Sequence, residues 1–159
     1  MASYDSLIIG EIAEDTNVDY DGTVVHAVGG AVYYSGFAAA NIGHKIAVLP
    51  KADTAKIDLK AAFAKATNIT VYPLHSRNSF VTKNVYHTPD RERRTSTVDS
   101  AIDPYRPEEV PEEIHAKIWH LAGSRLGRPA RMGKSVLGRL MRFSFRRCQR
   151  LRFLFCGCS

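Results

Sequence analysis

The stretch GGAVYYSGFAAANIGHKIAVL, residues 29–49, organises this chain. Paired glycines precede a run of small and apolar residues, and Gly43 separates that run from the apolar segment Ile46 to Leu49. This order predicts a turn, a helix with a glycine after its last residue, and a buried strand. Glycines at a helix start let a ligand approach the backbone, and free N–H groups of the first turn can bind hydroxyl or anionic oxygen. A tight turn with a packing role only is the alternative.

The residues before the glycines predict a strand and a hairpin. The apolar run within Ser6 to Gly10 is typical of a strand buried on both faces of a parallel sheet. The acidic segment Glu11 to Asp15 follows it, and Asn17 to Ala27 surrounds the dipeptide Asp21-Gly22. Because Asp-Gly is a strong signal for a two-residue hairpin turn, we expect a hairpin that lies outside the main sheet.

The residues after the glycine helix alternate between helix and strand patterns. Thr54 to Lys65 has apolar residues at helical spacing, and Ile69 to Tyr72 reads as a strand. Pro107 to Glu113 resembles a helix N-terminus with proline and acids, and Ile118 to Leu121 reads as a further strand. This alternation predicts a parallel α/β sheet.

A polar hairpin interrupts the alternation between Asn78 and Val98. Its arginines, Arg91, Arg93 and Arg94, admit three interpretations: a solvated charged edge, a phosphate contact or a partner contact. His75 and His87 have no spaced carboxylates or cysteines beside them, so we expect structural or solvated histidines and no metal site.

The order of strand, acidic residue, hairpin, Gly-Gly, alanine-rich helix, glycine and strand resembles the N-terminal half of the ribokinase or PfkB family of carbohydrate and nucleoside kinases. The resemblance covers roughly residues 5–123. It implies an α/β, ribokinase-like, Rossmann-type fold: a mostly parallel sheet with helices on both faces and a small β-hairpin lid, here truncated. In that family a hairpin near residues 78–98 covers the substrate, and some members dimerise through it.

The resemblance also implies which residues bind the substrate. In the family, the acidic residue after the first strand and the paired glycines hold substrate hydroxyls, and these roles carry over to Asp15, Gly29 and Gly30. The family commonly has asparagine four residues after the second glycine, where this chain has Tyr34, so we expect Tyr34 to face a different substrate class. Pro50 to Asp53 stands where relatives usually have a glycine-containing loop, and we assign no role to it.

Composition separates residues 1–123 from residues 124–159. At 159 residues with 45% hydrophobic and 24% charged residues, the chain is ordinary for one soluble globular domain. It has no apolar run long enough to span a bilayer and no secretory signal pattern, so we expect a cytoplasmic protein. The net charge of +6 arises in the tail, because residues 124–159 hold ten of the 22 basic residues and none of the sixteen acidic ones.

The tail, residues 124–159, does not resemble the family. All three cysteines lie in it, without a second pair or histidine for zinc, and Gly127 to Ser135 misses the glycine spacing of a P-loop by one residue. A frameshifted or mis-spliced reading frame explains this composition, and we expect a tail that does not pack on the fold. A basic amphipathic segment that binds a membrane surface or RNA is the alternative.

The sequence therefore predicts the N-terminal part of an ATP-dependent PfkB-type kinase that phosphorylates a hydroxyl of a sugar, polyol or nucleoside. The family's glycine-rich turn with a catalytic aspartate, Gly-Ala-Gly-Asp, does not occur in the sequence, so no catalytic residue is assigned and we expect no activity. The intact family uses ATP and Mg²⁺, and we expect this chain to bind neither. A homodimer through the lid hairpin is possible in the family, and we expect no specific nucleic acid and no membrane partner. A non-catalytic binding module that uses the lid or the tail is the alternative function.

Overall fold

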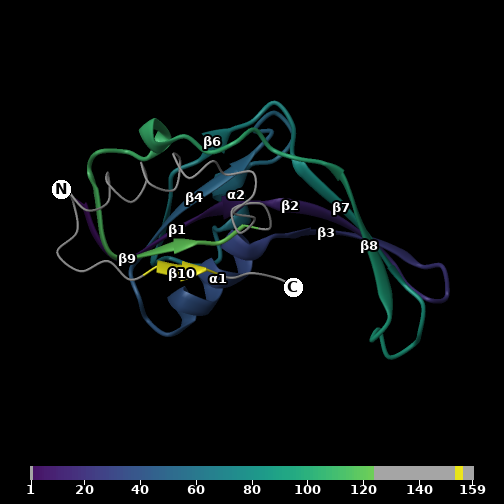
Figure 1. Cartoon of the computed structure of the whole chain (residues 1–159). Helices are drawn as coiled ribbons and strands as arrows, with labels where there is room; N and C mark the ends of the chain where they lie inside the picture. Colours follow the sequence, from purple (N-terminus) through teal and green to yellow (C-terminus); the bar gives the residue numbers. More distant parts are fainter. Residues whose placement is uncertain (1, 124–152, 156–159) are drawn as a thin grey trace.

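The computed structural model describes residues 2–123 and 153–155 and contains two β-sheets. Sheet A is a parallel α/β sheet, and sheet B projects from one end of it (Figure 1). No helix in the described residues is long and apolar enough to cross a membrane. The predicted α/β class is confirmed by this architecture.

Sheet A has the strand order β10-β9-β1-β4-β5, with β6 paired to β4 beyond the end of β5. Every pairing in it is parallel. Its strands are β1 (Ala2–Glu11), β4 (Ile46–Ala52), β5 (Ile69–Val71), β6 (Leu74–His75), β9 (Ile114–Leu121) and β10 (Phe153–Phe155). β1 and β9 are longer than predicted because they pair with each other from Ala2 and Ile114 onward.

Helix α1 (Ala31–Asn41) follows the paired glycines as predicted. It ends in a Schellman motif, in which the Gly43 N–H donates to the Ala40 carbonyl and the His44 N–H donates to the Ala39 carbonyl. The chain then enters β4, whose seven residues are all buried. The predicted order of helix, glycine and buried strand is confirmed.

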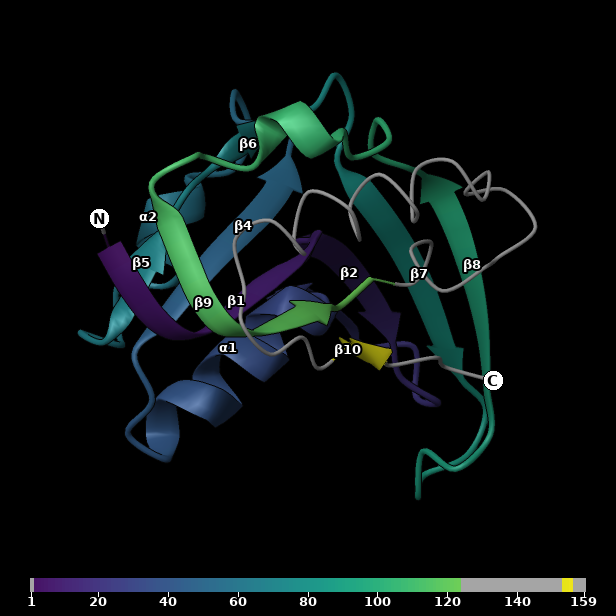
Figure 2. The same cartoon turned by 60° about the vertical axis from the view of Figure 1, so that its left-hand side comes forward.

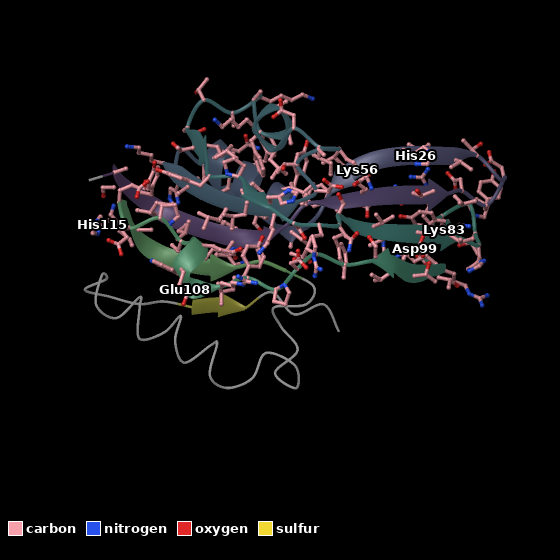
Figure 3. The ribbon with its side chains drawn as sticks, turned by 90° about the horizontal axis from the view of Figure 1, so that it is seen from above. His26, Lys56, Lys83, Asp99, Glu108 and His115 are labelled. Atoms are coloured by element: carbon pink, nitrogen blue, oxygen red, sulfur yellow. The ribbon has the colours of Figure 1, made fainter. Side chains whose placement is uncertain are left out.

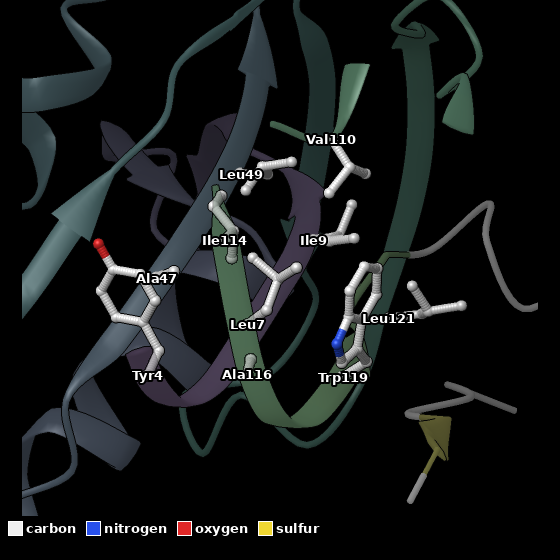
Figure 4. Packing of buried hydrophobic residues seen from close by; sticks show 10 residues of the cluster. All are labelled: Tyr4, Leu7, Ile9, Ala47, Leu49, Val110, Ile114, Ala116, Trp119 and Leu121. Atoms are coloured by element: carbon white, nitrogen blue, oxygen red, sulfur yellow. The ribbon is translucent and has the colours of Figure 1, made fainter. Parts of the chain in front are cut away.

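The two faces of sheet A bury different residues. On one face, Ile8, Val48 and Val32 pack with Phe63, so both described α-helices lie on this side. On the other face, a cluster surrounds Trp119 and is closed by Val110 from the segment before β9 (Figure 4). Its remaining fully buried members are Tyr4, Leu7, Ile9, Ala47, Leu49, Ile114, Ala116 and Leu121.

Two predicted helices are shorter in the structure. Instead of a helix over residues 54–65, only α2 (Leu59–Ala62) forms. The Asp53 carboxylate accepts from the Ala55 N–H and ends β4 in a turn, while Asp58 caps the first turn of α2. The predicted helix over residues 107–113 is a 3₁₀ turn, η1 (Pro107–Glu109). Over residues 54–65 the prediction was wrong because short aspartate-capped turns took the place of the first helical turns.

Sheet B joins the two predicted hairpins into one sheet. Its order is β3-β2-β7-β8, with antiparallel pairing inside each hairpin and parallel pairing between β2 and β7 (Figures 1 and 2). Its strands are β2 (Ala13–Val18), β3 (Val24–Gly29), β7 (Phe80–Tyr86) and β8 (Arg94–Ser100). The first turn is longer than the predicted two residues, because the Asp19 N–H donates to the Thr23 carbonyl across a loop of Tyr20 to Gly22.

One segment of the tail is part of sheet A. Strand β10 pairs in parallel with β9, with Phe153 opposite Trp119. The expectation that the tail does not pack on the fold is wrong for these three residues, since backbone pairing with an open sheet edge needs no matching side chains. The other tail features considered above, at residues 124–152 and 156–159, lie outside the described residues.

Candidate functional site

The candidate site lies where the two sheets meet. β2 follows β1 with only Ile12 between them, and Gly29 and Gly30 connect β3 to α1. The carboxyl end of β1 and the N-terminus of α1 therefore arrive at the same place as the base of sheet B. Ligands of open parallel sheets commonly bind beyond the carboxyl ends of the strands.

The structure brings Asp15, Gly29 and Tyr34 together. A Cβ atom on Gly29 would lie 2.5 Å from the Asp15 Oδ2 atom and 3.3 Å from the Tyr34 hydroxyl oxygen. Any side chain at position 29 would displace this carboxylate, so the glycine makes room for Asp15. The other carboxylate oxygen, Oδ1, accepts a hydrogen bond from the Thr82 hydroxyl on β7.

Gly30 has a backbone role and makes no side-chain contact. Its φ of 102° and ψ of 154° belong to a region that essentially only glycine adopts. A Cβ atom there would lie 2.5 Å from the Glu11 carbonyl oxygen and 3.0 Å from the Ala13 nitrogen. Gly30 is the N-cap of α1, and no side chain in the described part of the chain caps that helix, which leaves N–H groups of its first turn for another oxygen.

Tyr34 lies on the first turn of α1 with its side chain largely in solvent. Its exposed fraction is 62%, and its ring meets the Tyr33 ring edge-on with centroids 5.5 Å apart. An exposed aromatic ring beside Asp15 offers an apolar surface and a hydroxyl where the family commonly has an amide. The substrate-binding roles of Asp15, Gly29, Gly30 and Tyr34 remain predictions that their proximity supports.

Sheet B presents further polar side chains on the same face as Asp15. We call this the Asp15 face, and it consists of Asp15, Asn17, Thr82, Asn84 and Ser96, which strand register places together. The Asn84 Nδ2 donates to the Asn17 Oδ1 at 3.0 Å, and the Ser96 hydroxyl donates to the Asn84 Oδ1 at 2.6 Å. Sequence reasoning missed these residues, although Asn17 follows Asp15 by two positions and so shares its side of the strand.

The tip of sheet B is closed by an ion pair between the two hairpins. Arg91 donates to the Asp19 carboxylate and lies 5.4 Å from the centroid of the Tyr86 ring. The hydrogen bond from Arg91 lowers the pKa of Asp19. Of the three interpretations offered for the arginines, none anticipated this internal contact. A cavity of about 140 Å³ lies here, lined by Asn17, Asp19, Thr23, Val25, Tyr86 and Arg91.

A second charged group, missed by sequence reasoning, lies at the carboxyl end of β4. The Lys51 side chain is 2% exposed, and its Nζ lies 2.7 and 2.9 Å from the two Glu109 carboxylate oxygens and 3.0 Å from the Pro104 carbonyl. Tyr105 lies against it, with its ring centroid 5.0 Å from Nζ, and burial raises the pKa of Tyr105 well above its usual range. These contacts fix the segment before β9 over the sheet.

The histidines named from the sequence are hydrogen-bonded to threonines. The Nδ1 of His75 lies 2.9 Å from the Thr54 hydroxyl, and the Nε2 of His87 lies 2.8 Å from the Thr95 hydroxyl. Within residues 2–123 and 153–155, no group of three or more histidine, cysteine, aspartate or glutamate side chains could hold a metal ion.

The face of sheet B opposite Asp15 has a different character. Glu14, Thr16, His26 and Lys83 lie on it by strand register, and Figure 3 shows His26 and Lys83 on the part of the sheet that projects beyond sheet A. A hollow of about 450 Å³ is bordered mainly by this face and also reaches Asp15. One Glu14 oxygen is buried there with no hydrogen-bond partner among residues 2–123 and 153–155.

Three solved structures are similar to this chain. A pyrophosphate-dependent kinase of the ribokinase family, in a sulfate complex, is 26% identical over 75% of this chain and 41% of that chain, with a TM-score of 0.59. A pyrophosphate-dependent kinase of the ribokinase family, in complex with a pyrophosphate analogue and myo-inositol, is 22% identical. The match covers 93% of this chain and 48% of that chain, with a TM-score of 0.69. Fructokinase from Xylella fastidiosa with bound ATP is 15% identical over 94% of this chain and 48% of that chain, with a TM-score of 0.64.

These similarities confirm the predicted ribokinase-like fold and the resemblance to the ribokinase or PfkB family. No protein-family model and no curated protein matches the sequence. The chain spans less than half the length of the solved kinases described above.

Proposed function

We propose that this chain is the acceptor-binding half of a kinase that phosphorylates a hydroxyl of a sugar, polyol or nucleoside. The proposal starts from the fold, which the chain shares with the ribokinase-family kinases. The observation that carries this proposal is the Asp15 carboxylate beside Gly29, at the junction of the two sheets. The kinase with myo-inositol among the similar structures favours a polyol within that class.

Asp15 has the chemistry to bind the acceptor. Its Oδ1 is held by Thr82, and its Oδ2 lies against Gly29, in the same place as the Tyr34 hydroxyl. A substrate hydroxyl that donates to this carboxylate would contribute roughly 1.5–3 kcal/mol, or about tenfold to more than a hundredfold in affinity. The N–H groups at the start of α1 would donate hydrogen bonds to another substrate oxygen.

We assign no transfer step to this chain. Phosphoryl transfer depends on a base near the acceptor hydroxyl and on groups that stabilise charge on the transferring phosphoryl group. In the intact family, bound Mg²⁺ supplies part of that stabilisation together with the nucleotide. The sequence has no Gly-Ala-Gly-Asp motif, so no residue is assigned as the base.

The test measures binding and turnover separately. Calorimetry of the purified chain against myo-inositol, fructose, ribose and adenosine should show binding of at least one acceptor. Asp15→Ala should weaken that binding about tenfold or more. Thr16→Ala, on the opposite face of the same strand, is the matched control and should leave it unchanged. An Asp15→Ala chain that binds as tightly as the wild type would show that the assignment of Asp15 is mistaken.

The same chain with ATP or pyrophosphate should give no product above background. Phosphorylated acceptor formed by the purified chain alone would overturn the proposed inactivity. Activity only after addition of a C-terminal fragment of a related kinase would instead support complementation. For the tail, reading the coding DNA beyond Gly123 in the other two frames tests the proposed frameshift: strand and helix patterns ending in a glycine-rich aspartate motif would establish it.

A non-catalytic interaction module is the second candidate function, and sheet B favours it. Val24 and Val28, on the face opposite Asp15, are 53% and 42% exposed. Apolar side chains on an open sheet face suit contact with another protein surface, including a second copy of this chain. Sedimentation of the wild type and a Val24→Lys/Val28→Lys variant tests this: a wild-type monomer at high concentration contradicts the dimer.

A further inference from the structure

The Asp15 face of sheet B extends beyond the residues assigned from the family resemblance. Asp15 and Asn17 are two residues apart on β2, so their side chains leave the same face about 7 Å apart along the strand. Strand register confirms the shared face, because Asp15 lies opposite Thr82 and Asn17 lies opposite Asn84 on β7. The Asp15 carboxylate and the Asn17 amide therefore lie on one face of sheet B, at a spacing that a polyol with two hydroxyls would have to bridge.

The orientation of the Asn17 amide is fixed by a chain of hydrogen bonds. The Ser96 hydroxyl donates to the Asn84 Oδ1 at 2.6 Å, which leaves the Asn84 Nδ2 to donate to the Asn17 Oδ1 at 3.0 Å. The oxygen of the Asn17 amide is thus occupied, and its nitrogen is the free end. No residue in the described part of the chain accepts a hydrogen bond from the Asn17 Nδ2. Two N–H donors consequently remain for a ligand.

The space beside Asn17 selects for an uncharged group. The cavity of about 140 Å³ at this position is large enough for more than one hydroxyl-sized group. Its one cationic lining residue, Arg91, is paired with Asp19, so the two side chains together carry no net charge. The Asp15 carboxylate, one rung along the sheet, repels anions.

We infer that Asn17 is a second acceptor-binding and specificity-determining residue, whose Nδ2 donates to a hydroxyl oxygen of an uncharged polyol held at the other end by Asp15. This inference rests on the proposed function. It adds a hydrogen-bond donor two residues from the Asp15 carboxylate, which accepts hydrogen bonds. The two side chains therefore bind two different hydroxyls of the same polyol. Phosphorylated and carboxylated analogues of the same polyol are rejected.

The test uses the full chain, with myo-inositol and its monodeoxy analogues as calorimetric ligands. Asn17→Asp retains an oxygen that accepts from Asn84 and removes both N–H donors. It should bind myo-inositol about tenfold or more weakly than the wild type does. Asn17→Ala removes the donors without adding charge and should show a similar loss. Thr16→Ala is the control, and amide NMR spectra establish that each variant is folded.

The deoxy analogues locate the contact. One monodeoxy inositol should bind the wild type weakly and lose no further affinity on Asn17→Ala, because the hydroxyl and its donor act as a pair. If Asn17→Ala lowers the affinity of every analogue by the same factor as that of the parent, or leaves the parent unchanged, the inference is overturned. Loss of binding in Asp15→Ala with no effect of either Asn17 variant would overturn only this inference. Failure of the wild type to bind any uncharged polyol would overturn it together with the polyol preference.

Discussion

Strands β1 and β2 are neighbours in sequence, yet they lie in environments of opposite kind. β1 is buried continuously from Ser6 to Glu11, between two clusters of apolar side chains. β2 is only half-buried after Ala13, and in its partner β3 both Val24 and Val25 are more than 50% exposed. Sheet A therefore holds the apolar burial that stabilises the fold, whereas sheet B is held by backbone pairing and polar side chains.

Because of this difference, the stability of the chain depends mainly on sheet A, and the proposed ligand binding depends on sheet B. A strand buried on both faces cannot offer polar side chains to a ligand without losing apolar contacts. A strand that is open to solvent can, since its polar groups are satisfied by neighbours or water. Asp15 and Asn17 lie on β2, and their hydrogen-bond partners Thr82 and Asn84 lie on β7. Changes in sheet A should thus affect unfolding, and changes on the Asp15 face should affect ligand affinity.

The largest expected effect on stability comes from the ion pair between Lys51, at the carboxyl end of β4, and Glu109. Glu109→Ala leaves the Lys51 ammonium, 2% exposed, without its carboxylate, and we expect a loss of about 3–5 kcal/mol in the free energy of unfolding. Lys51→Met should lower the free energy of unfolding by less. Methionine keeps an apolar side chain in the buried position, and the carboxylate left without its partner, Glu109, is 26% exposed and can be hydrated. Urea unfolding of both variants measures the difference. A Glu109→Ala chain as stable as the wild type would show that the pair does not brace the sheet.

A matched pair of apolar truncations compares the two sheets directly. Leu7→Ala in β1 removes a fully buried side chain and should cost about 2–5 kcal/mol. Val24→Ala in β3 removes a side chain that is 53% exposed and should change stability by less than about 0.5 kcal/mol. Thermal and urea unfolding measure both values. Equal costs for the two substitutions would remove the proposed division between the sheets.

The smallest effect concerns acid stability at the junction between the sheets. Hydrogen bonds from the Arg77 side chain and backbone lower the pKa of Asp103 to about 2. Because this folded-state pKa lies below the ordinary value of 3.8, the contribution of Asp103 is fully present above about pH 4 and is lost as the pH falls toward 2. The stability difference between the wild type and Asp103→Asn should therefore shrink over that range. A constant difference from pH 5 to pH 2 would contradict the assignment.

The sequence was sufficient for the parts of the fold that depend on local pattern. The glycine-opened helix, the apolar strand at Ile46 and the hairpin around Asp21-Gly22 all carry short-range signals, and the structure contains each of them. The helix expected over residues 54–65 failed because apolar periodicity competes with aspartate capping, which favoured tight turns at Asp53 and Asp58.

Contacts between residues distant in the chain could not be predicted from the sequence. Asp15 and Gly29 could be named from the family resemblance, but nothing near Asp15 indicates that Thr82 would hold its carboxylate. Lys51 received no role from the sequence, since its burial depends on Glu109, a residue distant in the chain. A lysine at a strand end gives no local sign that a carboxylate will cover it.

The parallel pairing of β2 with β7 also bears on how the site is assembled during folding. Thr82 follows Asp15 by 67 residues, and closing a loop of that length costs chain entropy before the contact is made. The β2–β3 hairpin, by contrast, pairs residues close in sequence and can form early. A peptide of residues 13–29 would contain Asp15, Asn17 and Gly29 but neither Thr82 nor Asn84, so the carboxylate and the amide would lack the bonds that orient them. The proposed acceptor site is thus a product of the long-range topology and not of the hairpin that carries Asp15 and Asn17.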